Sequence, residues 1–265
     1  MKNWTEHTWV ICAYKVSTYL EDAIKSVKSQ TLKSNVIMVT STPNEHIQGL
    51  SKKYDIPLFV NLGESGIAGD WNFGYEKATT NIVTICHQDD IYKENYAESI
   101  KKMIDRDKST LIAFSGYGEL RDGKEVYSNK LLNIKKIMLF PLRIGAFQKS
   151  KWIRRRILSM GSPICCPAVT YVKSNLPMFA FQNHYKSDLD WEAWENISRK
   201  IGRFSYIYKP LVLHRIHEES ATTEIIGESL RSKEDYEMFC KFWPKWVARI
   251  ICNQYVKSEK SNNIK

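Results

Sequence analysis

Two adjacent carboxylates stand directly after an apolar run in the first half of the chain. The run at residues 81–86 (NIVTIC) leads into the sequence HQDD, which ends in Asp89 and Asp90. Carboxylate oxygens are hard ligands that suit Mg²⁺ or Mn²⁺, and such an ion can bridge to a diphosphate. The pair therefore forms a candidate metal site. A plain loop whose aspartates cap the following helix is the alternative interpretation.

The elements that must position this pair follow from the hydrophobic pattern. In the first 115 residues, short apolar runs alternate with longer amphipathic ones, which predicts strands alternating with helices. Such alternation implies a parallel sheet covered by helices on both faces, with ligands bound at the carboxyl ends of the strands. We predict strands at 8–13, 36–40, 58–61, 81–86 and 111–115, and helices at 19–30, after Pro43 and Asn44, at 69–78 and at 94–105.

Beyond residue 120 the pattern is weaker, and residues 130–160 are apolar and basic together. A helix at 190–200, stopped by Gly202, is the strongest prediction in this half. The other predicted elements are a turn at 121–124, a strand at 168–172, an extended run at 204–215, and C-terminal helices at 224–240 and 245–256 on either side of Pro244. The fold class is therefore α/β with additional C-terminal helices.

Two common phosphate-binding motifs are absent. The chain has no GxGxxG after its first predicted strand and no GxxxxGK[ST]. A parallel α/β sheet without a glycine-rich loop must hold phosphates in another way, and a divalent cation held by carboxylates is the common alternative.

The composition of the 265 residues excludes several classes of protein. Apolar residues make up 43%, charged residues 26% and aromatic residues 12%, so disorder, collagen and coiled coil are excluded. No stretch approaches the ~18 uncharged apolar residues that a membrane span needs. The N-terminal sequence MKNWTEHTWV does not resemble a signal peptide, and six scattered cysteines without a CxxC indicate reduced thiols. We therefore expect a cytoplasmic protein.

The net charge of +10 arises in one segment. Residues 126–187 contain eleven Lys and Arg and no Asp or Glu, so the remainder of the chain has a net charge of −1. Within residues 130–156 the cations are mixed with aromatic and aliphatic side chains, which suits an anionic lipid surface. A solvated basic face and a nucleic-acid-binding patch are the alternatives, although no recognised nucleic-acid module is present and we expect no nucleic-acid partner.

Four blocks of sequence are informative when they are taken in order. They are VICAYKVSTYLEDAIKSVKSQT, SGIAGDWNFGYEKATTNIVTICHQDD, SDLDWEAWENISRKIG and KPLVLHRIHEES, and together they cover roughly residues 8–222. The ordered set resembles glycosyltransferase family 2 with the GT-A fold. The resemblance implies an inverting transferase that moves a sugar from a nucleotide-sugar donor to a saccharide or lipid-linked saccharide acceptor, in bacterial surface polysaccharide synthesis.

The resemblance also implies roles for single residues. It implies Mg²⁺ or Mn²⁺ bound by Asp89 and completed by His217, with Asp190 as the carboxylate that deprotonates the acceptor hydroxyl. It implies an acceptor loop at Gly161 and Ser162. It implies donor contacts by Ala13, Tyr14, Lys15, Asp70, Asn72, Asp90 and Arg215. Without the resemblance, Asp190 is equally a helix N-terminal acid, His217 a structural histidine and Arg215 a salt-bridge partner.

The chain departs from the family pattern at three places of this site. One is Leu189, which stands where the family's ED pair has its Glu, with Asp188 one place earlier, whereas Asp190 keeps the position of the second acid. His87 stands where the family has the first Asp of its DxD motif, and residues 39–42 (VTST) stand where the family often has acids that hold the nucleotide. An inactive GT-A scaffold that only binds a ligand is therefore an alternative to an enzyme, as is a basic nucleic-acid-binding protein. The implied organisation is a transferase domain at 1–222, with a donor half at 1–115 and an acceptor half at 116–222, followed by a helical extension at 223–265.

Overall fold

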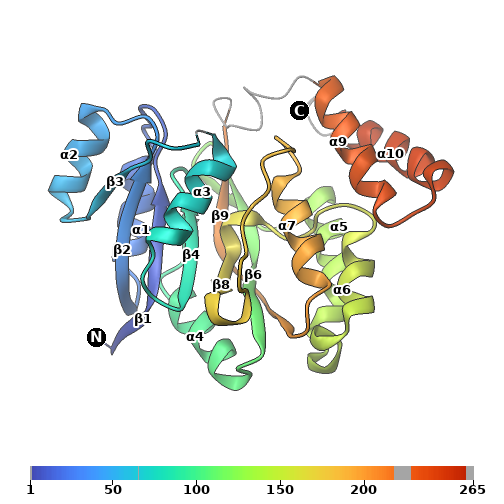
Figure 1. Cartoon of the computed structure of the whole chain (residues 1–265), viewed down its shortest axis with the longest axis horizontal. Coiled ribbons are helices and arrows are strands. Elements are labelled where there is room, and N and C mark those ends of the chain that lie inside the picture. The colour runs from blue at the N-terminus through green and yellow to red at the C-terminus, as the bar shows by residue number, and fades with distance from the viewer. Residues whose placement is uncertain (1, 65, 218–227, 261–265) are drawn as a thin grey trace.

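A computed structural model describes residues 2–64, 66–217 and 228–260 of the protein (Figure 1). The expected α/β class is confirmed, because a nine-stranded sheet is packed between helices. Its strands are β1 (Lys2–Cys12), β2 (Leu32–Thr40), β3 (Leu58–Val60), β4 (Ile82–His87), β5 (Ile91–Tyr92), β6 (Thr110–Arg121), β7 (Lys124–Val126), β8 (Val169–Val172) and β9 (Arg203–Ile216). Its α-helices are α1 (Leu20–Lys28), α2 (Glu45–Lys53), α3 (Ile67–Lys77), α4 (Tyr96–Arg106), α5 (Lys130–Leu139), α6 (Lys151–Leu158), α7 (Leu189–Ser198), α9 (Glu228–Cys240) and α10 (Lys245–Lys260).

The strand order is β3-β2-β1-β4-β8-β6-β9-β5, with β7 paired to β6. The first four strands pair in parallel, and β6 and β9 run in the same direction as they do. The strands β8, β5 and β7 run the opposite way. The carboxyl ends of β1, β4 and β9 therefore meet at one edge of the sheet, the upper edge in Figure 1.

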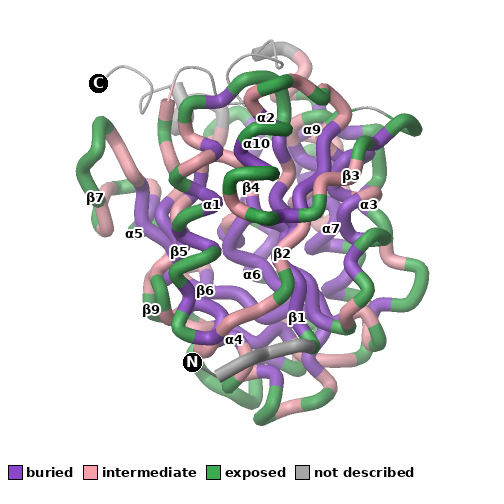
Figure 2. The backbone as a smooth tube through the Cα atoms, turned by 90° about the vertical axis from the view of Figure 1, so that its left-hand side faces the viewer, coloured by how far each residue is buried: buried purple, intermediate pink, exposed green. Residues whose placement is uncertain are grey.

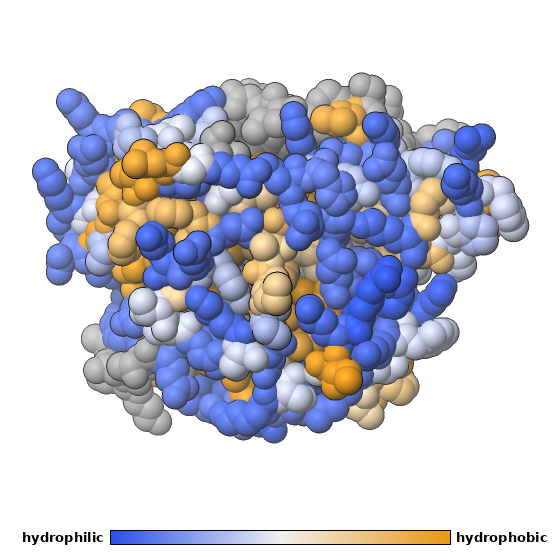
Figure 3. All heavy atoms as spheres, viewed as in Figure 1, coloured by the Kyte–Doolittle hydropathy of each residue, from blue (hydrophilic) through white to orange (hydrophobic). Residues whose placement is uncertain are grey.

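Two hydrophobic clusters, one on each face, sandwich the sheet. One cluster contains buried residues of α1, α2 and α4, and the other contains those of α3, α6, α7, α9 and α10. Figure 2 shows the buried stretches running through the strands, with exposed residues mostly in the loops and on the outer sides of helices. Trp191 and Trp194 are almost fully buried, as expected for core residues. In Figure 3 the surface is mostly hydrophilic, with hydrophobic side chains gathered around β3.

Local sequence explains several element boundaries. The side chain of Asn44 accepts a hydrogen bond from the Ile47 backbone N–H, so the expected helix start at Pro43 and Asn44 is confirmed. The expected turn at 121–124 joins β6 to β7, with positive φ at Asp122 and Gly123. Gly74 lets α3 approach the sheet, because a Cβ there would lie 2.4 Å from Val10 Cγ1.

Several elements differ from the sequence-based predictions. β6 is longer than the predicted strand at 111–115, and β5 and β7 were not predicted. β5 has only two residues and depends on pairing with β9. Part of the basic segment forms α5 and α6, joined by the short 3-10 helices η1 (Phe140–Arg143) and η2 (Gly145–Lys149). The proposed boundary between 222 and 223, and positions 224–227 of the predicted helix at 224–240, lie outside the described residues.

Within the described ranges, no helix combines the length and the apolar character that crossing a membrane requires. All six cysteines are free thiols.

Candidate active site

The candidate residues gather where the carboxyl ends of β1, β4 and β9 meet. β4 ends at His87, β9 ends at Ile216 immediately before His217, and α7 carries Asp190 in its first turn. The ends of β4 and β9 and the start of α7 can be followed in Figure 1.

Asp90 is fully buried and holds the end of β9. Its Oδ1 accepts hydrogen bonds from His214 Nδ1 at 2.9 Å and from the Arg215 backbone N–H at 3.0 Å. Burial raises the pKa of Asp90, but the charge and hydrogen bond of His214 and the proximity of His87 outweigh burial and hold it well below its usual range. The expectation that Asp90 contacts the donor meets a physical obstacle, because its side chain has no exposed surface. His214, which the sequence analysis did not single out, is its main partner.

Asp89 and His217 lie together, although they are 128 positions apart in the sequence. His217 Nε2 is 2.9 Å from Asp89 Oδ2. The His217 side chain is only 13% exposed and the Asp89 side chain 17%. Arg215 Nε donates to the Asp89 backbone carbonyl at 2.9 Å. The Arg215 guanidinium also lies 4.4 Å from the centre of the Tyr19 ring and 3.3 Å from Asp22 Oδ2. Arg215 is thus fixed by contacts within the chain.

His87 fits a metal-binding group rather than a simple loss of the family's aspartate. One ligand atom each from His87, Asp89 and Asp90 lies within 4.8 Å of the others, which is close enough for one ion. The His87 ring stacks on Trp71 at 5.0 Å, and its Nε2 is buried without a hydrogen-bond partner. A nitrogen and carboxylate oxygens together suit Mn²⁺ better than Ca²⁺.

The end of β1 carries the three residues expected at the nucleotide. Ala13 is buried and donates its N–H to the Val39 carbonyl, whereas Tyr14 is 40% exposed. The Tyr14 N–H donates to Gln88 Oε1 at 2.9 Å, so this turn is attached to the segment that carries Asp89. Lys15 adopts a left-handed φ of 53°, and its ammonium lies 5.2 Å from the centre of the Tyr14 ring. Exposed aromatic and cationic groups therefore face solvent at this edge.

Asp70 reaches the ends of β2 and β3 from α3. Its Oδ2 accepts from Ser41 Oγ at 2.7 Å and its Oδ1 from Asn61 Nδ2 at 2.8 Å. A carboxylate thus lies beside residues 39–42, where the sequence lacks the family's acids. Asn72 has a different partner from the one expected: its side-chain amide makes two hydrogen bonds, of 2.7 and 2.9 Å, with the Phe181 backbone.

Asp190 is partly buried in the first turn of α7. Burial raises the pKa of Asp190, and the Trp191 backbone N–H, at 2.6 Å from Oδ1, limits the rise together with the charges of Lys135 and His87. A carboxylate with a raised pKa is a better proton acceptor than an ordinary one. Burial, Asp235 and Asp190 raise the pKa of Asp188 well above its usual range.

Lys135 lies within electrostatic reach of the site, although the basic segment that contains it was expected at a membrane surface. Its Nζ lies 5.5 Å from the centre of the Tyr117 ring. Its charge lowers the pKa of both Asp190 and His214, which places it within electrostatic reach of both. One signal was available in the sequence: Lys135 is three residues after Leu132 and four before Leu139, both buried.

The expected acceptor loop contacts the C-terminal helices. Gly161 has a φ of 132°, and a Cβ there would lie 2.9 Å from the ring of Tyr255 on α10. Ser162 Oγ is buried without a hydrogen-bond partner.

Two arginines of the basic segment are not surface cations. Arg154 is fully buried and donates to the carbonyls of Lys200 and Gly202. Arg155 pairs with Glu195 and donates to the Lys241 carbonyl. The expectation that both face a membrane is therefore wrong, since the helical pitch of α6 directs them into the protein. The exposed cations of residues 130–156 include Lys130, Arg143, Lys151 and Arg156.

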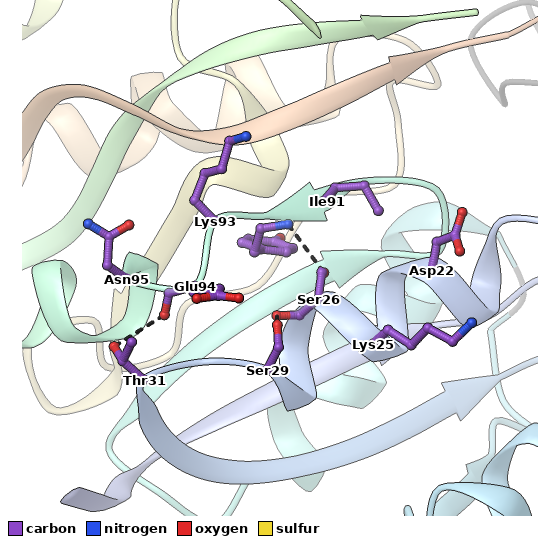
Figure 4. A pocket seen from close by; sticks show the side chains of 10 residues that line it. Asp22, Lys25, Ser26, Ser29, Thr31, Ile91, Lys93, Glu94 and Asn95 are labelled. Carbon is purple, nitrogen blue, oxygen red and sulfur yellow. Dashed lines mark hydrogen bonds between the residues drawn. The ribbon is translucent and has the colours of Figure 1, made fainter. Parts of the chain in front are cut away.

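A separate hollow of about 710 Å³ lies between α1 and the segment from β5 to the start of α4 (Figure 4). Ser26, Ser29, Thr31, Lys93 and Glu94 are among its lining residues. Two hydrogen bonds cross it, from the Tyr92 N–H to Ser26 Oγ and from Thr31 Oγ1 to the Glu94 carbonyl. None of the expected site residues lines this hollow.

The fold is shared with one class of protein of known structure, the GT-A glycosyltransferases. The structure of *S. aureus* TarS 1-349 in complex with UDP-GlcNAc is similar with a TM-score of 0.64 and 15% identity, covering 95% of this chain and 72% of that one. The mannosyltransferase PcManGT from Pyrobaculum calidifontis, in complex with GDP-Man and Mn²⁺, is similar with a TM-score of 0.64 and 12% identity, covering 96% and 70%. This chain covers 43% of the longer *S. aureus* TarS structure.

The sequence places the protein within that class. The family model for glycosyl transferase family 2 matches residues 8–161, more than half of the chain, and the protein belongs to this family. No curated protein matches the chain in sequence.

Proposed function

We propose that the protein transfers a sugar from a nucleotide-sugar donor to the hydroxyl of a saccharide or lipid-linked saccharide, with inversion at the anomeric carbon. The observation that carries this proposal is the pairing of Asp89 with His217 at the carboxyl ends of β4 and β9, with Asp190 within electrostatic reach of His87. The similar structures with UDP-GlcNAc and with GDP-Man and Mn²⁺ support a nucleotide-sugar donor. Bacterial surface polysaccharide synthesis is the setting that the sequence resemblance favours.

The residues at the end of β4 fit a divalent cation. Asp89 and His217 would hold Mn²⁺ or Mg²⁺, because their side chains, 2.9 Å apart, supply carboxylate oxygen and imidazole nitrogen. His87 would be a further nitrogen ligand, because one of its ligand atoms lies within 4.8 Å of those of Asp89 and Asp90. When bound, the ion would neutralise the negative charge that develops on the leaving diphosphate. In this proposal the buried Asp90 orients His214 and the Arg215 backbone.

The chain's own side chains supply the remaining steps. Asp190 takes the proton from the acceptor hydroxyl while the oxygen of that hydroxyl attacks the anomeric carbon. The bond between the anomeric carbon and the diphosphate breaks on the opposite side. One base and one in-line displacement invert the centre. Lys135 places a positive charge near Asp190, where it favours the ionised carboxylate.

The donor nucleotide is assigned to the end of β1. Tyr14 offers an exposed ring for the base, Lys15 a nearby cation, and Asp70 a carboxylate at the ends of β2 and β3. Asn72 is assigned the role of holding the backbone at Phe181, and not that of a donor contact. Gly161 and Ser162 remain assigned to the acceptor side.

Thermal unfolding with a panel of nucleotide sugars and Mn²⁺ tests the donor assignment. A ligand at 100 times its dissociation constant should add about 2.7 kcal/mol to the free energy of unfolding. We expect a shift with the uridine, thymidine or guanosine nucleotide sugars, and a smaller one without Mn²⁺. The absence of a shift with every member of the panel would contradict the proposal.

We also propose that residues 130–156 hold the enzyme against an anionic membrane surface, on the cytoplasmic side, where a lipid-linked acceptor would be presented. The exposed cations of this segment alternate with exposed apolar side chains, and each Lys or Arg near such a surface contributes about 1 kcal/mol. The exposed apolar residues are Ile134, Ile137, Phe140, Ile144, Phe147 and Trp152.

A further inference from the structure

The segment that leads to Asp190 has no regular structure of its own. Residues 176–188, between η4 (Lys173–Asn175) and α7, contain no helix or strand. Asp190 follows two residues later, so the position of the proposed base depends on what holds this segment. A shift of about 1 Å in a reacting group can lower a rate by ~10²-fold.

Glu234 of α9 binds the C-terminal end of this segment through hydrogen bonds. Its Oε2 accepts from the Ser187 N–H at 2.7 Å and from the Ser187 hydroxyl at 2.6 Å, and more distantly from the Asp188 N–H at 3.3 Å. The Lys186 N–H lies 3.0 and 3.1 Å from the two carboxylate oxygens. One side chain thus binds three consecutive backbone N–H groups.

These contacts hold the residues immediately before α7, in a place where the helix lacks the usual side-chain cap. The first N–H groups of a helix lack partners within it, and the N-cap side chain normally satisfies one of them. Asp188 is the N-cap residue of α7, yet its side chain makes no capping hydrogen bond. Glu234 is only 4% exposed, and although burial raises its pKa, the Ser187 hydroxyl and the backbone N–H groups lower it below the usual range. The carboxylate therefore stays ionised at the N-terminal side of α7, where negative charge is favourable.

The middle of the segment is held by α3. Asn72 of α3 makes both of its amide hydrogen bonds to the backbone of Phe181. Phe181 is buried and packs edge-on against Trp71 at 5.0 Å, and Trp71 in turn stacks on His87. The segment is thus fixed in its middle by α3 and at its C-terminal end by α9.

We propose that Glu234 is a positioning residue that sets the location of Asp190, so that the C-terminal helices form part of the catalytic unit. This inference rests on the proposed role of Asp190 as the base. It assigns to α9 a task that the sequence resemblance, which ends near residue 222, does not cover.

The test compares Glu234→Ala and Glu234→Gln with Lys233→Ala, an exposed position on the same helix. Hydrogen exchange should become faster at the amides of residues 186–188 in Glu234→Ala, by about 10-fold or more, and remain unchanged in Lys233→Ala. The kcat for sugar transfer should fall by about 10-fold or more in Glu234→Ala, while the dissociation constants of UDP and GDP with Mn²⁺ change less than about twofold. Glu234→Gln keeps one accepting oxygen and should restore most of the kcat.

Two results would overturn the inference: wild-type kcat in Glu234→Ala, or unchanged exchange at 186–188. If Glu234→Ala does not fold, Glu234→Gln decides, because its exchange at 186–188 should still exceed that of Lys233→Ala, and equal exchange would overturn the inference. Failure of the proposed function gives a different result: wild-type protein would transfer no sugar, whereas the exchange comparison would still report on the grip of Glu234.

Discussion

At the scale of single residues, the proposed base faces two opposing demands. Burial raises the pKa of Asp190, which strengthens it as a proton acceptor but lowers the fraction ionised near neutral pH. Lys135, His87 and the Trp191 N–H limit that rise. The pKa of Asp190 is therefore set by burial, which raises it, and by nearby positive charge, which lowers it. Substitutions can change the carboxylate and the positive charge separately.

Replacing Asp190 with Asn removes the basicity and retains the shape. Turnover of sugar transfer should fall by about 10² or more, while the affinity for the donor changes little. Steady-state kinetics with the identified donor and isothermal titration with its nucleoside diphosphate measure the two quantities. Normal turnover in Asp190→Asn would move the base elsewhere, with Asp188 as the next candidate.

Replacing Lys135 with Met should shift the pH dependence of kcat. The base acts in its ionised form, so activity rises as the pH passes through the pKa of Asp190. Lys135 lowers this pKa, and its removal should move the acid limb to higher pH, with the greatest loss of activity at low pH. Lys130→Met, an exposed change on the same helix, is the control and should leave the limb in place. A shift to lower pH, or none, would contradict the placement of Lys135.

Part of this site could be predicted from the sequence. Asp89 and His217 were expected on one ion, and the structure places them 2.9 Å apart. His214, Lys135 and Glu234 were not identified, because each acts through a contact between distant elements that no local spacing reveals. The single partial signal was the helical spacing of Lys135 from buried leucines.

At the scale of elements, the alternating strands and helices of the first 115 residues could be predicted from the sequence. Most of the elements after residue 120 could not be predicted as well. The strands at 8–13 and 81–86 and the helix after Asn44 follow from hydrophobic periodicity and capping. β5 is too short to leave a periodic pattern, and it exists because β9 pairs with it. The two helices of the basic segment bury only part of their surface, so exposed apolar residues obscured their period.

The packing of α3 against the sheet gives a prediction about stability. Gly74→Ala should lower the free energy of unfolding by about 1–3 kcal/mol, because the added Cβ would lie 2.4 Å from Val10 Cγ1 and 3.2 Å from Val39 Cγ2. Gly49→Ala in α2, where no atom lies within 4 Å, is the matched control and should stabilise by up to about 1 kcal/mol. Urea unfolding monitored by circular dichroism measures both. Equal midpoints for the two variants would show that α3 does not require the close approach.

At the scale of the whole molecule, the C-terminal helices are joined to the transferase domain by polar contacts as well as by packing. Trp243 Nε1 donates to the Ser159 carbonyl, and Lys241 pairs with Glu192 on α7 at 2.5 Å. Glu234 adds the contacts to residues 186–188. The sequence resemblance treated residues 223–265 as an extension, whereas these contacts connect α9 and the turn after it with the end of α6, with α7 and with the segment before α7.

The basic segment gives a prediction about association with membranes. The double variant Arg143→Glu and Lys151→Glu should weaken sedimentation with anionic vesicles by about 10-fold or more, since each cation contributes about 1 kcal/mol. The same charge change at Lys28 and Lys52, which are exposed on α1 and α2, is the control and should have a smaller effect. Salt should release the wild-type protein. Equal recovery in the supernatant with and without anionic vesicles would eliminate electrostatic docking at this segment.

The most direct test of the central claim measures release of nucleoside diphosphate from nucleotide sugars by the wild-type protein and by Asp89→Ala, each with Mn²⁺. The account predicts that wild-type protein releases the diphosphate from at least one donor and that Asp89→Ala, although folded, releases almost none. Chelation of the metal should reduce wild-type release to the same level. Undiminished release by Asp89→Ala, or by wild-type protein in chelator, would contradict the assignment of a metal-assisted glycosyltransferase site at the end of β4.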